Sequence, residues 1–415
     1  MTSPRTSTVR IILASRFYRS AFAALLLSGL AVSATLPQLT LFLVRDLGAS
    51  YTVAGLYYVT NLAAPVAGFL LGRLSDRRED RLGLFRVCAV VGALGWLAMA
   101  LSTEVWMPFV ISAVALSISG ASMAQLFAAT RDELSRQPTG ADNRILSAVR
   151  MAFTAGWVLG PVLGSWLGSV VGLRPLLVAT AVLTLSQVLP LGGQRVLRFR
   201  HPGHELAGTR SPRGSRRRMV PLLAFTGLCV LAMTGDTIKF GFLPLYMADE
   251  LGVPDTVRGA VIAIQPLLEL TLMPFLARFA DRYGPLKVMV FGLALGVGAN
   301  LAFATSTGVA GLFLGQLLAA GLWAALGALG VSIAQHLYPE GVGTASGVFL
   351  SSMTLGAATG GLIGGFGVAR LGLPEVFYVP AVLSAIALVG LVVLERRLRV
   401  REPLAVPEPV ASGRR

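Results

Sequence analysis

The chain has 415 residues, of which 54% are hydrophobic and 13% are charged, and its mean hydropathy is +0.72. Soluble proteins usually carry about 25% charged residues, so the composition excludes an ordinary soluble globular protein and indicates a polytopic membrane protein. The net charge of +15 would suggest nucleic-acid binding in a soluble protein, so its placement along the chain has to be considered first.

Twelve apolar stretches are long enough to cross a membrane. A spanning helix needs about 20 mostly apolar residues, because lipid offers the backbone no hydrogen-bond partners and a helix satisfies them internally. We expect an all-α membrane protein with two pseudo-symmetric six-helix bundles, at 18–194 and 219–395. The spans are expected at 18–44, 51–73, 83–102, 105–130, 146–169, 172–194, 219–247, 256–279, 285–306, 308–335, 342–369 and 374–395.

Basic residues are distributed unevenly about these stretches. If both termini are cytoplasmic, 30 of the 35 Lys and Arg residues face the cytoplasm, four face the opposite side, and Lys239 lies within a span. An excess of Lys and Arg in cytoplasmic loops is the usual determinant of membrane orientation. We therefore expect a cytoplasmic N-terminal segment at 1–17, a cytoplasmic linker at 195–218 and a cytoplasmic tail at 396–415. We therefore expect the basic residues to orient the protein in the lipid bilayer, and we expect no nucleic-acid partner.

A short charged turn follows the second predicted helix and recurs after the eighth, 205 residues later. Asp76 can accept hydrogen bonds from a neighbouring helix N-terminus or pair with arginine, and Arg77 and Arg81 would complete a latch. Topology marking alone would account for the arginines but not for an aspartate in both copies. A similar network is expected between the fourth and fifth helices. The residues expected to act in gating are Gly72, Asp76, Arg77, Arg81, Arg131, Arg150, Asp281 and Arg282.

Small residues recur at four-residue intervals in the fifth and eleventh predicted helices. This spacing places them on one helix face, where they allow close helix approach. Tight packing is the simpler interpretation, and a face of this kind can also slide or seal in a transporter whose halves rock. The packing residues are expected to be Gly156, Gly160, Pro161, Gly164, Gly356, Gly360 and Gly364.

Two parallel six-helix halves joined by a basic linker resemble the major facilitator superfamily. The first charged turn is similar to that superfamily's loop G-x-x-x-D-R-x-G-R-R, although Glu79 replaces the loop glycine. Residues 156–164 fit G-x-x-x-G-P-x-x-G, a pattern associated in the superfamily with exporters.

Further segments resemble the bacterial sugar efflux transporters. They are Pro37-Gln38-Leu39, Gln125 with Phe127 and Arg131, Arg150, and Leu268-Glu269. The resemblance implies a multi-pass protein of the bacterial cell membrane that works as a monomer and exports sugars or sugar-like compounds in exchange for protons. Many proton-coupled exporters of the superfamily have an arginine in the fourth helix. Residues 105–130 contain none, so proton coupling here depends on analogy.

Three ionisable residues, Asp236, Lys239 and Glu269, lie well inside the predicted spans rather than near their ends. An ionisable group near the bilayer centre costs at least about 2.5 kcal/mol, so it usually faces water, a partner or a substrate. Asp236 and Lys239 lie on one helix face and could form a neutralising ion pair or bind substrate. Glu269 has no cation nearby in the sequence, and we expect it to carry the proton, with Asp236 assisting. A hydrogen bond to Gln265 is the alternative role for Glu269.

Polyhydroxylated solutes are bound by side chains that donate and accept hydrogen bonds, together with aromatic faces. Each polar residue within a span could instead stabilise helix packing. As a group they are expected to outline a central substrate site. Its members are Gln38, Asn61, Gln125, Asp236, Lys239, Gln265, Gln316 and Trp323.

The expected function is export of sugars or sugar-like compounds by proton antiport and alternating access. A multidrug exporter is the nearest alternative, a proton-coupled importer is opposed by the motif at 156–164, and a nontransporting sensor on the same fold stays open. An enzyme or ATP-driven pump is not expected, because both lysines lack a Walker A context and the three histidines lie outside the helix interiors. No cofactor and no metal site is expected.

Overall fold

The computed structural model describes residues 8–137, 142–197 and 216–401. Twelve helices in these ranges are long and apolar enough to cross a membrane, as the sequence predicts. The termini before residue 8 and after residue 401, and most of the predicted linker, lie outside the described residues.

The first bundle contains six spans, several of which are divided by short 3₁₀ or π segments. Its elements are α1 (Thr8–Ala14), α2 (Arg16–Thr35), η1 (Leu36–Gln38), α3 (Leu39–Leu41), η2 (Phe42–Asp46), α4 (Tyr51–Tyr57), η3 (Tyr58–Leu62), α5 (Ala63–Arg77), α6 (Arg81–Ala100), α7 (Trp106–Ile111), η4 (Ser112–Leu116), α8 (Ser117–Arg136), α9 (Asp142–Val171), α10 (Leu173–Ser186) and η5 (Leu189–Leu191).

The second bundle has longer uninterrupted helices. Its elements are α11 (Arg216–Leu245), η7 (Tyr246–Glu250), α12 (Asp255–Tyr283), α13 (Pro285–Ala304), α14 (Val309–Leu337), η8 (Pro339–Gly341), α15 (Val342–Leu371), η9 (Glu375–Phe377) and α16 (Tyr378–Arg401).

The same turn occurs once in each bundle, after the first and the seventh span. The π segments η2 and η7 end the two spans, and each is followed by a glycine with positive φ, 69° at Gly48 and 60° at Gly252. The backbone N–H of Ala49 donates to the carbonyl of Leu43 at 2.9 Å, and that of Val253 donates to Met247 at 2.8 Å. The duplication therefore extends to backbone hydrogen bonding at this end of the molecule.

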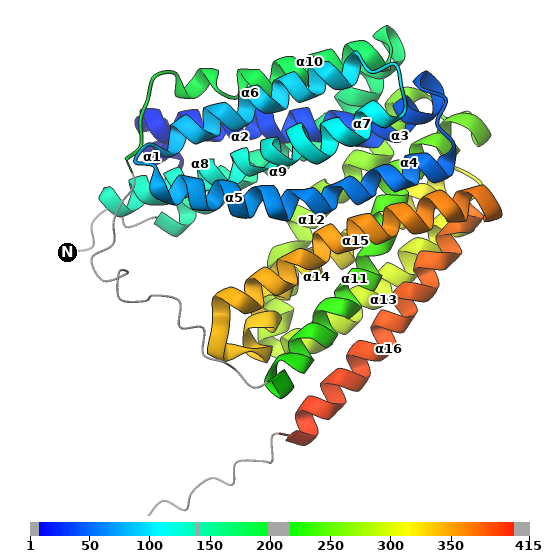
Figure 1. Cartoon of the computed structure of the whole chain (residues 1–415). Helices are drawn as coiled ribbons and strands as arrows, with labels where there is room; N and C mark the ends of the chain where they lie inside the picture. The colour runs from blue at the N-terminus through cyan, green and yellow to red at the C-terminus, as the bar shows by residue number, and fades with distance from the viewer. Residues whose placement is uncertain (1–7, 138–141, 198–215, 402–415) are drawn as a thin grey trace, which may run out of the picture.

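The two bundles meet at one end and diverge toward the other. In Figure 1, α4 and the last turns of α15 lie together, whereas α5 and the first turns of α15 are far apart. A Cβ added at Gly55 would lie 2.5 Å from Cα of Gly365, and one added at Gly259 would lie 2.7 Å from Cα of Val162. We call the end with the π turns the closed end, and the end with the turns at 72–81 and 277–287 the basic end.

The predicted packing glycines make close contacts within each bundle. A Cβ at Gly156 of α9 would lie 2.5 Å from the backbone nitrogen of Leu30 in α2, and one at Gly356 of α15 would lie 2.8 Å from Cβ of Met233 in α11. Both faces therefore pack against the first helix of their own bundle. Sliding between the bundles would involve Gly55 and Gly259 instead.

Two hydrophobic clusters fill the second bundle, one toward each end. Met233 of α11 belongs to the cluster near the basic end, and Ile238 belongs to the cluster near the closed end. The part of α11 between these residues contains Asp236 and is followed by Lys239. The charged residues of α11 are thus placed where the two apolar clusters meet.

Candidate functional site

A buried lysine is the centre of the polar contacts inside the second bundle. Lys239 is 2% exposed, and its Nζ donates to Oδ1 of Asp236 at 2.5 Å and to Oε1 of Gln265 on α12. The ammonium also lies 4.4 Å from the centroid of the Phe240 ring. A buried ammonium requires compensation of this kind, since removal of either partner would leave a charge or a polar atom unpaired in an apolar interior.

Glu269 lies one turn after Gln265 on the same face of α12. It is partly buried, and its charge interacts with Asp236 and Lys239 of α11 and with Arg150 of α9. Within the described residues it forms no hydrogen bond or ion pair. The alternative bond to Gln265 is not formed within the described residues, and Oε1 of Gln265 instead accepts from Lys239. Glu269 is therefore an unpaired carboxyl beside a buried ion pair.

A small cavity adjoins the lysine between α11, α13 and α14. Its volume is about 20 Å³, enough for about one water molecule, and its wall includes Asp236, Lys239, Asn300 and Trp323. Gln316 lies on the Trp323 face of α14, two turns away; it is fully buried, and neither amide atom has a partner. Sequence reasoning missed Asn300, whose amide donates to the carbonyl of Gly296 at 2.9 Å.

An aromatic contact connects the first bundle to this region. Trp157 of α9 and Phe240 of α11 form an edge-to-face pair with ring centroids 6.1 Å apart. Because Lys239 lies over the same Phe240 ring, movement of α9 relative to α11 would disturb the packing around the ammonium. No role beyond its place in the glycine motif was predicted for Trp157.

Three of the predicted substrate residues lie away from Lys239. Gln38 is buried in the first bundle and its Nε2 donates to Ser165 Oγ at 2.9 Å, and Gln125 is buried at the basic end. Asn61 is partly exposed in η3. In this conformation Gln38 and Gln125 join helices of the first bundle. Asp236, Lys239, Gln265 and Trp323 are the predicted residues that the structure brings together, with Gln316 nearby.

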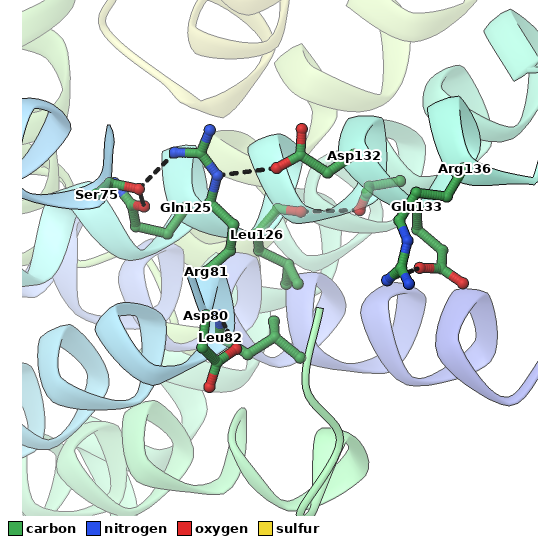
Figure 2. A network of polar contacts seen from close by, with 10 residues as sticks. Ser75, Asp80, Arg81, Leu82, Gln125, Leu126, Asp132, Glu133 and Arg136 are labelled. Atoms are coloured by element: carbon green, nitrogen blue, oxygen red, sulfur yellow. Dashed lines mark hydrogen bonds and ion pairs between the residues drawn. The ribbon is translucent and has the colours of Figure 1, made fainter. Parts of the chain in front are cut away.

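Arg81 joins three helices at the basic end of the first bundle (Figure 2). Its Nη1 donates to Ser75 Oγ at 2.6 Å, and its Nε donates to Asp132 Oδ2 at 2.9 Å. Ser75 in turn donates to Oε1 of Gln125 at 2.5 Å. Charged hydrogen bonds of this geometry hold the ends of α5, α6 and α8 together.

The expected latch differs from this network in its members. The Asp76 side chain lies outside what the structure describes, and Arg77 is exposed. Arg131 and Arg150 are also exposed. The Asp76–Arg77–Arg81 latch therefore stays a prediction, and the structure adds Ser75 and Asp132 as partners of Arg81.

The second copy of the turn has a different environment. Asp281 and Arg282 are both exposed, and the Arg282 guanidinium lies 5.3 Å from the ring centroid of Tyr283. Within the described residues Asp281 forms no ion pair. The predicted symmetry of the two turns does not extend to their side-chain contacts.

A second duplicated segment went unnoticed in the sequence. Leu47-Gly48 and Thr52-Val53-Ala54-Gly55 recur as Leu251-Gly252 and Thr256-Val257-Arg258-Gly259, with an offset of 204. A search for self-similarity near the known offset of 205 would have found it. Arg45, just before the first copy, forms an ion pair with Asp249 of the other bundle.

The fold and the buried charges define a membrane transporter built of two similar bundles, and comparisons with known proteins give its family. The family model of the Major Facilitator Superfamily matches residues 21–224 and again 225–412, so the chain belongs to this superfamily of transporters.

Among curated proteins, the chain is 28% identical over 370 residues to sugar efflux transporter A of Escherichia coli (strain K12), covering 87% of this chain and 91% of that protein. It is 27% identical over 371 residues to a putative sugar efflux transporter of Deinococcus radiodurans, covering 88% and 94%. It is also 27% identical over 379 residues to multidrug resistance protein MdtG of Enterobacter lignolyticus, covering 86% and 87%.

Among solved structures, the nucleoside transporter NupG has a TM-score of 0.75 at 17% identity, covering 92% of this chain and 98% of that one. This similarity concerns the fold alone.

Proposed function

We propose that this protein is a secondary exporter of sugars or sugar-like compounds that takes in protons in exchange, through alternating access. Similarity over most of the chain to proteins named sugar efflux transporters supports export. The observation that carries the proposal is the unpaired Glu269 beside the Lys239–Asp236–Gln265 cluster, because an exchanger needs a proton-binding group next to a polar substrate site.

The orientation follows from the charge distribution. With the basic end in the cytoplasm, as the excess of Lys and Arg there favours, both termini are cytoplasmic and the closed end faces outward. The conformation in Figure 1, with the bundles apart at the basic end, is then inward-facing. Substrate enters from the cytoplasm in this state, and the bundles then rock so that the basic end closes and the closed end opens to release the substrate outside.

Two residues that line the cavity beside Lys239 suit a hydroxylated solute, since Asn300 offers donor and acceptor atoms and Trp323 offers an aromatic face. Gln316, two turns from Trp323 along α14, offers a further buried amide. The cavity of about 20 Å³ is too small for a sugar, so binding requires the cavity to widen toward the space between the bundles. The unpartnered amide of Gln316 favours this, because a polar ligand would relieve its unsatisfied burial.

The test is transport by purified protein in proteoliposomes. Radiolabelled mono- and disaccharides are screened for movement driven by a pH gradient, and Glu269→Gln is compared with Glu104→Gln, which changes an exposed carboxyl in the loop before α7. We expect loss of gradient-driven transport in the first variant alone, with substrate-for-substrate exchange retained. Gradient-driven transport at the wild-type rate in Glu269→Gln would rule out this proton site.

Similarity to the protein named MdtG supports a second candidate, a multidrug exporter. Its substrates would be lipophilic cations, for which Asp236 and Glu269 offer negative charge. Cells that express the chain are challenged with toxic sugar analogues and with lipophilic cations. Resistance to the cations alone would favour the second candidate, and net accumulation of a labelled sugar would instead indicate an importer.

A further inference from the structure

Two oppositely charged side chains of different bundles interact across the junction of the bundles without pairing. Glu269 belongs to α12 of the second bundle and Arg150 belongs to α9 of the first, and their charges interact. Within the described residues neither group forms a hydrogen bond or an ion pair. Arg150 is exposed, so its guanidinium is free to move.

The packing of α9 against α12 fixes the level of the two residues independently. The helices are antiparallel and touch near the closed end, where Gly259 packs against Val162. Glu269 lies ten residues after Gly259 on α12, and Ala152 lies ten residues before Val162 on α9. Each is therefore about 15 Å closer to the basic end than the contact between Gly259 and Val162. Arg150 lies about half a turn beyond Ala152, so it is nearly level with Glu269 on the diverging parts of the two helices.

The other charged groups near Glu269 are already engaged. Lys239 of α11 is bonded to Asp236 and Gln265, and Asp236 itself is negative. On the α14 side, a Cβ added at Gly327 would lie 3.8 Å from Oε1 of Glu269. Arg150 is therefore the one charged group among those acting on Glu269 that is both positive and unengaged.

We propose that Arg150 is the counter-charge that converts the protonation state of Glu269 into movement of the two bundles. This rests on the proposed role of Glu269 as the proton carrier. With Glu269 ionised, attraction to Arg150 draws α9 and α12 together and favours closure of the basic end. A proton on Glu269 removes the attraction, and the basic ends separate. Arg150 acts as a positioning residue, because it changes the conformation and contacts neither proton nor substrate.

Each protonation state of Glu269 then favours one conformation of the transport cycle. Protonation of Glu269 from outside breaks the pair and favours the inward-facing state, where the proton leaves to the cytoplasm. Ionised Glu269 then favours the outward-facing state as substrate is carried out. A ligand shifts an equilibrium only by its differential affinity for the two states, and here the proton binds better when Arg150 is distant.

The experiment measures the separation of the basic ends against pH, without any substrate. Spin labels are attached to Leu74→Cys on α5 and Val342→Cys on α15, and both native cysteines are buried, so the introduced thiols react first. Distances are recorded in lipid nanodiscs. In the wild-type background we expect the ratio of closed to open molecules to rise about 5- to 150-fold from acidic to alkaline pH, the range usual for coupled sites.

Matched variants separate the outcomes. Arg150→Gln should abolish the pH dependence, Arg150→Lys should retain most of it, and Arg144→Gln, an exposed arginine earlier on α9, should leave it unchanged. The exchanged pair Arg150→Glu with Glu269→Arg should restore closure that no longer depends on pH. Infrared spectroscopy should show that Glu269 still titrates in Arg150→Gln.

Two results would overturn the proposal. One leaves the proposed function intact, and the other contradicts the proposed function as well. If Arg150→Gln keeps the wild-type pH dependence while Glu269→Gln loses it, Arg150 is not the counter-charge and Glu269 remains the proton carrier. If Glu269→Gln keeps both the pH dependence and gradient-driven transport, the proposed proton site fails together with this inference.

Discussion

The two bundles are nearly identical at the closed end and differ in the interior. Gly48 and Gly252 end equivalent π turns, and Gly55 and Gly259 make equivalent contacts with the opposite bundle. In contrast, the positions of the first bundle that correspond to Asp236, Lys239 and Glu269 at the offset of 204 hold Val32, Thr35 and Pro65, which carry no charge. The duplication thus gave a symmetric junction at the closed end, and the ion pair of α11 lies on one side of it.

At the basic ends, it is the first bundle that has the more extensive polar contacts. Arg81 of the first bundle is held by Ser75 and Asp132, whereas Leu286 stands at the equivalent position of the second turn, 205 residues later, and Lys287 beside it is exposed. The first bundle therefore has a bonded basic end, and the second has an exposed basic turn together with a buried lysine in its interior. The following variants test this division, beginning with the largest expected effect.

Lys239→Met should be the most damaging change, because it leaves Asp236 partly buried without its cation. Breaking one partner of a buried pair typically costs about 3–5 kcal/mol of stability, and replacement of both partners is often nearly neutral. We expect a strongly lowered melting temperature for Lys239→Met and recovery in the double variant with Asp236→Asn, measured by thermal unfolding in detergent. Equal stability of the single and double variants would show that the pair does not stabilise the second bundle.

Arg81→Gln should destabilise the first bundle, since it removes charged hydrogen bonds to Ser75 and Asp132. Bonds to charged groups contribute about 1.5–3 kcal/mol, whereas an exposed substitution usually changes stability by under about 0.5 kcal/mol. Lys287→Gln changes the exposed cation next to the equivalent position of the second turn and should have little effect. Thermal unfolding of both variants checks the asymmetry, and similar losses would contradict it.

Gly55→Ala and Gly259→Ala should weaken the closed end to a similar degree, because each added methyl meets the backbone of the opposite bundle. Overpacking typically costs about 1–3 kcal/mol, and here it falls on the inward-facing state. We expect both variants to shift the spin-label distances at the basic end toward the closed population. A shift in only one of the two variants would show that the Gly55 and Gly259 contacts are not equivalent.

Arg45→Gln should have the smallest effect. Arg45 and Asp249 join the bundles at the closed end, but their side chains are 46% and 45% exposed, and such pairs contribute about 0.2–1 kcal/mol. A double-mutant cycle with Asp249→Asn, read from the same label distances at low and high salt, should give a small coupling that salt reduces. A coupling that is large and insensitive to salt would assign the pair a larger part in closure.

Much of the scaffold was predictable because it depends on local chemistry. Twelve spans follow from apolar length, and the packing of Gly156 and Gly356 follows from their spacing. The bonds of Arg81 to Ser75 and Asp132 were not predictable, because these residues meet Arg81 only when α5, α6 and α8 assemble. The bond between Gln265 and Lys239 likewise joins residues on different helices.

The sequence by itself determined the fold class, the duplication and the presence of charge inside the second bundle, since hydropathy and spacing are properties of single helices. Only the tertiary structure decided which of these groups are paired. It placed Lys239 against Gln265, left Glu269 unpaired, and set Arg150 of the other bundle at the level of Glu269. The physical reason is that pairing in a low-dielectric interior depends on distances between helices, which no pattern within one helix specifies.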